Sequence, residues 1–176
     1  EIASLLRDVG VAVLEGQSIE VDTAGGSVGV AGVKGFGGGF PGASGAEFGE
    51  PEMKAFIRHT KERSEALGSA LASLRTDVRV ALMHYAPIRE TLQGEPPEIF
   101  PFLGSYLLAE AVDRSGADLV IHGHAHRGTE HGVTPGGVNL RNVAQPVIRQ
   151  AYAVYGFETA TRRRDPATVR SSRSRS

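Results

Sequence analysis

The stretch "IHGHAHRG" places His122, His124 and His126 within five positions, and a fourth histidine, His84, directly follows the apolar run "VALM". Imidazole is the commonest protein metal ligand near neutral pH, and several neutral imidazoles that converge indicate a metal site. At the end of a strand, His-x-His spacing lets two side chains face one cavity. We therefore predict that His84, His124 and His126 bind metal.

Other histidines in the chain have surroundings that favour structural roles. His122 immediately precedes a glycine at the end of an apolar run, so we expect it to pack behind the metal ligands and support them. His59 falls on the polar face of a predicted helix and His131 in a predicted turn, where we expect both to be solvated.

The elements that must position these histidines alternate between helical and strand periods. In the first part of the chain we predict a helix over 2–9 that ends at Gly10, and strands at 11–14, 18–21 and 27–33. Residues 35–49 are so rich in glycine that we expect a loop, either mobile or cradling a phosphate through its amides. That loop matches neither of the common glycine-rich phosphate-binding patterns.

The second part of the chain repeats one plan of helix, apolar strand and histidine. A helix starts at Pro51 and precedes the strand "VRVALM", and a helix over 101–115 precedes the strand "DLVIH". In open α/β sheets, ligands bind outside the carboxyl ends of the strands, where both histidine segments emerge. We therefore predict an α/β fold with the histidines at one sheet edge.

Composition limits the classes of protein that are possible. The 176 residues are 40% hydrophobic and include no cysteine, which suits one domain with a core and excludes disulfides and thiolate metal sites. We expect a cytoplasmic protein and no membrane partner, because no apolar run approaches the roughly 18 residues that a span requires. The chain starts with Glu1 inside an amphipathic stretch, so we expect a piece of a longer protein.

Charge is distributed unevenly along the chain. The net charge is −1, but residues 161–176 carry six Arg and one Asp, which leaves −6 for residues 1–160. We predict that this Arg/Ser-rich tail is disordered, because it has little apolar surface to bury. A solvated terminus is favoured over a nucleic-acid contact, and we do not expect nucleic acid as a partner.

Three segments together resemble a known family. "ALMHYAP", followed about forty residues later by "DLVIHGHAH" and then by "VNLRNVA", resembles the carboxyl-terminal half of the calcineurin-like metallophosphoesterases, over about residues 5–158. The resemblance implies a metallophosphoesterase-like domain at 1–160, the carboxyl-terminal portion of a four-layered α/β/β/α sandwich. It also implies metal-dependent hydrolysis of a phosphomonoester or phosphodiester, on a phosphorylated small molecule or a nucleotide.

The same resemblance implies roles for particular residues. His84 and His124 would bind one divalent ion and His126 the other, the ions being Mn, Fe or Zn. Two ions about 3.5 to 4 Å apart hold a phosphoryl oxygen and generate a bridging hydroxide nucleophile. Arg89, in the loop after His84, would either contact a phosphate or remain a solvated loop residue.

The chain departs from the family in its first half. The family's Asp-x-His, Gly-Asp-x-x-Asp and Gly-Asn-His-Asp segments are absent, and with them the bridging carboxylate and the catalytic histidine. Neutral imidazoles do not compensate two divalent charges, so we expect weak single-metal binding at best and no efficient turnover. The missing half would leave an apolar sheet face uncovered, so we expect self-association or a complementing amino-terminal segment.

Two other classes of protein remain as alternatives. One is a non-catalytic metal-binding or interaction module that retains half of the sandwich. The other is a histidine-triad nucleotide hydrolase, whose motif requires apolar residues between the histidines. Gly123, Ala125, Arg127 and Gly128 occupy those positions here, which is a poor fit.

Overall fold

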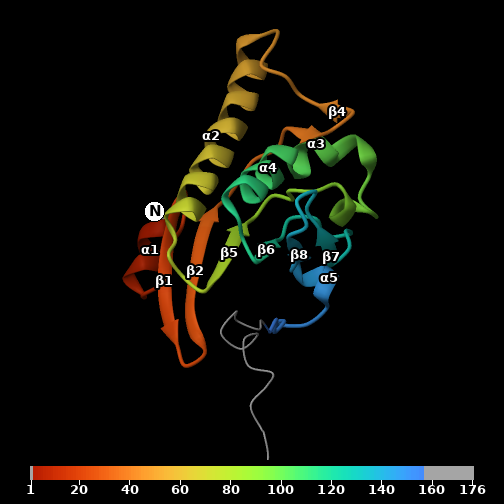
Figure 1. The fold of residues 1–176 in the computed structure, drawn as a ribbon. Coiled ribbons are helices and arrows are strands. Elements are labelled where there is room, and N and C mark those ends of the chain that lie inside the picture. The colour runs from red at the N-terminus through yellow and green to blue at the C-terminus, as the bar shows by residue number, and fades with distance from the viewer. Residues whose placement is uncertain (1, 157–176) are drawn as a thin grey trace, which may run out of the picture.

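The computed structural model describes residues 2–156. The predicted tail at 161–176, and the last four residues of the predicted domain, lie outside the described residues. The described chain forms a mixed α/β structure around one six-stranded sheet, with strand order β1-β2-β5-β6-β8-β7 (Figure 1). Its strands are β1 (Gln17–Thr23), β2 (Gly26–Val33), β5 (Val78–Met83), β6 (Leu119–His122), β7 (His131–Val133) and β8 (Asn139–Asn142).

The four central strands β2, β5, β6 and β8 are parallel, and the edge strands β1 and β7 pair with them antiparallel. The α-helices are α1 (Ile2–Asp8), α2 (Pro51–Ser73), α3 (Phe100–Leu103), α4 (Tyr106–Ser115) and α5 (Gln145–Ile148). Two 3-10 turns, η1 (Glu90–Leu92) and η2 (Pro97–Ile99), lie in the segment between β5 and α3.

Helices α2 and α4 cover one face of the sheet (Figure 1). Leu67 and Leu71 of α2 and Leu108 of α4 are completely buried in the main apolar cluster, together with alternate residues of β2, β5, β6 and β8. The two helices approach closely at Gly68, where an added Cβ would lie 3.2 Å from the Ser115 hydroxyl and 3.7 Å from the Ala111 methyl. This layer confirms the predicted alternation of helix and strand.

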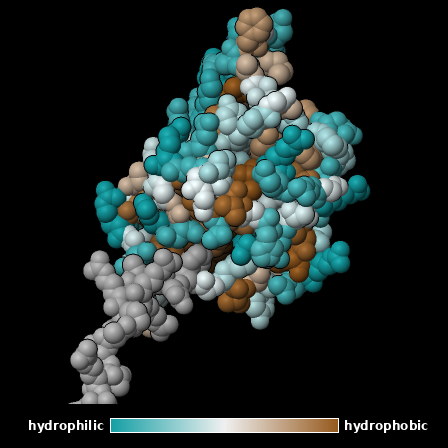
Figure 2. Space-filling model, turned by 45° about the vertical axis from the view of Figure 1, so that its right-hand side comes forward, coloured by the Kyte–Doolittle hydropathy of each residue, from teal (hydrophilic) through white to brown (hydrophobic). Residues whose placement is uncertain are grey.

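The opposite face of the sheet is also apolar, because the alternate residues of its strands are mostly valine, leucine and isoleucine. Val80 is buried there, but Leu82 is 42% exposed and Val21, on the edge strand β1, is 48% exposed. Elsewhere on the surface, Figure 2 shows hydrophobic patches separated by hydrophilic residues. The exposed side chains on β1 and β5 fit the expectation that this face lacks a full cover.

Two predicted elements differ from the structure. Residues 11–14 form no strand. Leu14 instead packs over Gly32, where an added Cβ would meet it at 2.5 Å. The helix predicted over 101–115 is interrupted between α3 and α4, because Gly104 passes so close to the Ala86 carbonyl that helix geometry cannot continue.

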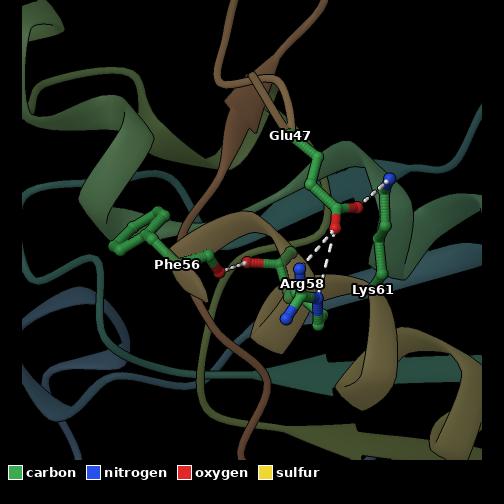
Figure 3. Close-up of polar contacts among 5 residues, drawn as sticks. Glu47, Phe56, Arg58 and Lys61 are labelled. Atoms are coloured by element: carbon green, nitrogen blue, oxygen red, sulfur yellow. Dashed lines mark hydrogen bonds and ion pairs between the residues drawn. The ribbon is translucent and has the colours of Figure 1, made fainter. Parts of the chain in front are cut away.

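The glycine-rich segment 35–49 is more ordered than predicted. It contains a two-stranded hairpin of β3 (Gly39–Phe40) and β4 (Ala43–Ser44). The end of the segment is attached to α2, because the Glu47 carboxylate lies 3.0 Å from the Arg58 guanidinium and 2.9 Å from the Lys61 amine (Figure 3). Among residues 2–156, no helix is long and apolar enough to cross a membrane.

Candidate functional site

Backbone hydrogen bonds hold the ends of three neighbouring parallel strands together. The carbonyl of Lys34, just after β2, accepts from the amides of His84 (3.0 Å) and Tyr85 (3.2 Å), which follow β5. The carbonyl of His84 accepts from the amide of Gly123, just after β6, at 3.2 Å. These contacts extend the sheet pairing past the strand ends, so side chains from three separate segments meet at one edge.

The structure brings His84 and His124 together. Their ring centroids are 4.5 Å apart, and the ring of Tyr85 lies 4.6 Å from that of His124. His124 has a left-handed backbone with φ of 68°, a conformation that costs a non-glycine residue on the order of 1–3 kcal/mol. This conformation directs the ring toward His84. The structure thus places these two segments side by side at the sheet edge.

Electrostatics at this edge favour neutral imidazoles. Desolvation is the main cause that lowers the pKa of His84, and the nearby charges of His124, Lys34 and His126 lower it further. Desolvation also lowers the pKa of His124, while hydrogen bonding to the Phe102 backbone acts in the opposite direction. Both rings are therefore deprotonated near neutral pH, and a deprotonated nitrogen is the form that binds metal.

His126 is exposed and does not join the ring pair, although its charge acts on the pKa of both His84 and His124. Within the part of the chain that the structure describes, no group of three or more His, Cys, Asp or Glu side chains could hold a metal ion. The three predicted ligands thus form a pair with a more distant third member.

His122 lies on the helix-covered face of β6 and is completely buried. Its Nδ1 donates to the Gly123 carbonyl at 2.7 Å, and because a carbonyl only accepts, its Nε2 must accept from the Thr91 hydroxyl at 2.9 Å. Burial lowers the pKa of His122 to about 4. This position matches the expectation that His122 packs behind the histidine pair.

The structure does not bring Arg89 to the histidines. Its guanidinium lies 5.7 Å from the centroid of the Phe100 ring, in a groove of about 390 Å³ that Glu90, Glu110 and Asp113 also line. None of the predicted metal ligands lines that groove.

Lys34 is the basic residue at this edge that sequence reasoning missed. It is exposed, lies one residue past β2 and acts on the pKa of His84. The available signal was its place directly after the apolar strand "VGVAGV", which is the same place that His84 takes after β5. That signal places Lys34 near His84 only when β2 and β5 are known to be neighbouring strands.

Comparison with known proteins finds no matching family model and no matching curated protein. One crystal structure is 19% identical with a TM-score of 0.47, and the match covers 76% of this chain and 46% of that one. A hypothetical protein from Thermus thermophilus is 17% identical with a TM-score of 0.45, covering 81% of this chain and 47% of that one. The chain thus spans about half the length of both structures.

Proposed function

We propose that the chain carries the carboxyl-terminal part of the metal site of a calcineurin-like metallophosphoesterase. The observation that supports this most is the pair of His84 and His124, whose rings lie 4.5 Å apart beyond the ends of adjacent parallel strands.

The residues present fit only part of such a site. His84 and His124 offer two neutral nitrogen ligands, whereas a stable site for a divalent ion usually has four or more. The described residues 2–156 contain no cluster that would complete it. We therefore expect weak binding of a single ion, and no hydrolytic step is assigned to these residues. Lys34 would contribute by attracting the phosphoryl oxygens of a substrate.

In the family's four-layered sandwich, a second sheet packs against the first. The partly exposed apolar face that carries Leu82 and Val21 is the surface on which a second sheet would pack. A complementing amino-terminal segment, or a second copy of this chain, would cover that face and remove its apolar side chains from water. The proposed location is the cytoplasm, whose reducing conditions suit a chain without cysteine.

Isothermal titration calorimetry, with Zn²⁺ or Mn²⁺ added to the chain, tests the proposal. We expect weak binding that is abolished in both His84→Ala and His124→Ala. His131→Ala is the matched control, because His131 is exposed on the edge strand β7 and should leave binding unchanged. Metal binding that is the same in the wild type and in both pair variants would overturn the proposal.

A non-catalytic metal-binding module is the second candidate, and the small number of ligands favours it. Hydrolysis of 4-nitrophenyl phosphate in the presence of Mn²⁺ distinguishes the two candidates. A phosphoesterase part-site should gain turnover when a segment that supplies carboxylate ligands is added, and the gain should depend on His124. A module would bind metal equally well with or without that segment and remain inactive.

A further inference from the structure

A second cavity includes Phe102, whose backbone acts on the pKa of His124. It is a groove of about 590 Å³ between the β3–β4 hairpin, the first turns of α2 and the short helix α3. Among residues 2–156, those that line it are uncharged: Gly38, Gly42, Ala43, Ser44, Gly45, Met53, Phe56, Ile57, Pro101 and Phe102. Small-molecule sites commonly have volumes of about 300–1,000 Å³ and mostly apolar walls. The groove has the size and character of a binding site for an apolar group.

Aromatic rings connect this groove to His124. The ring of Tyr85 lies 4.6 Å from His124 and 5.7 Å from Phe36, and Phe36 lies 4.9 Å from Phe56, which lines the groove. Phe56 in turn meets Phe102 edge-on at 6.4 Å. Phe102 is common to both places, because it lines the groove while its backbone acts on the pKa of His124. Phe102 and this row of packed rings link the groove to His124.

Several features of the groove restrict its occupant. Phe102 is 62% exposed and Met53 is 51% exposed, so the walls present two large apolar side chains to water. Within the described lining, the only polar side chain is the hydroxyl of Ser44, which leaves little for the hydrogen-bonding edge of a nucleotide base. A phosphate would find no cation among these lining residues. The walls therefore suit an aromatic or alkyl group and disfavour both a base and an anion.

We propose that this groove binds the apolar organic group of a phosphoester whose phosphoryl group lies at His84 and His124. This inference rests on the proposed function, since it places the phosphoryl group at the histidine pair. It narrows the expected substrate class to phosphoesters that carry an aromatic or alkyl group. Nucleotides are not expected to be substrates. Phe102 and Met53 would be binding residues that contact this group.

The test uses 1-naphthol and 1-naphthyl phosphate as probes of the 176-residue chain. The chain has no tryptophan, so naphthyl fluorescence anisotropy reports binding without interference from indole emission. We expect 1-naphthol to bind the wild type, and Phe102→Ser or Met53→Lys to weaken it by about tenfold, as expected when an aromatic contact is lost or a charge is placed in an apolar wall. Phe48→Ser is the matched control, because Phe48 is 85% exposed and does not line the groove.

A second measurement separates the groove from the histidine pair. With Zn²⁺ present, 1-naphthyl phosphate should bind more tightly than 1-naphthol, and His84→Ala should remove that difference while 1-naphthol still binds. If Phe102→Ser and Met53→Lys leave 1-naphthol binding unchanged, the groove is not the binding site and the proposal is overturned. A different outcome is that Phe102→Ser weakens 1-naphthol binding but 1-naphthyl phosphate binds no more tightly than 1-naphthol. That result would overturn the phosphoester assignment and the proposed function, while the apolar binding site itself would stand.

Discussion

Acidification should destabilise the fold through His122. This side chain is completely buried, and burial lowers its pKa from 6.5 to about 4. The unfolded chain therefore binds a proton below about pH 6.5, whereas the folded chain resists protonation until about pH 4. Because the unfolded state binds more protons in this window, the stability present above pH 6.5 is lost as the pH falls toward 4.

The size of the effect follows from the two pKa values. At about 1.4 kcal/mol per unit, the shift of His122 corresponds to about 3 kcal/mol once the pH is below 4. At pH 5 the loss relative to pH 7 is about 2 kcal/mol. That is a large part of the stability of a small domain, which is typically about 5–15 kcal/mol. The lowered pKa values of His84 and His124 add to the loss in the same direction.

Urea unfolding of the wild type and of His122→Asn at pH 7 and pH 5 measures the contribution. Asparagine keeps a donor near the Gly123 carbonyl but does not titrate, so the variant should lose about 2 kcal/mol less between the two pH values than the wild type. Exposed His131→Asn is the control and should follow the wild type. Equal pH dependence in the wild type and His122→Asn would refute the argument that a buried neutral His122 is responsible.

The two remaining predictions concern the two faces of the sheet. Leu71 of α2 is completely buried against the sheet, so Leu71→Ala should lower the free energy of unfolding by about 2–5 kcal/mol, as measured by urea denaturation. A decrease below about 1 kcal/mol would mean that this layer is loosely packed. Leu82→Asp, on the partly exposed opposite face, should change stability little but shift sedimentation toward the monomer. A wild type that is already monomeric at high concentration would contradict the expected self-association.

The local pattern of the sequence was enough to predict most of the elements. The apolar strands before His84 and His124, the helix from Pro51 and the strands at 18–21 and 27–33 all appear in the structure. Local periodicity records which faces of an element are buried, and this signal survives without knowledge of the partner. The prediction failed at 11–14, where the apolar segment forms no strand and Leu14 packs over Gly32 instead.

What the sequence determined by itself is therefore the alternation of helices and strands, and the position of His84 and His124 within two residues of the ends of two strands. Only the tertiary structure decided which strands are neighbours, and this places Lys34 beside His84 through the pairing of β2 with β5. It also decided that His122 is buried on the helix side and that the Arg89 guanidinium lies over the Phe100 ring. The reason is that burial and strand neighbours depend on contacts between residues far apart in the chain, which local patterns do not encode.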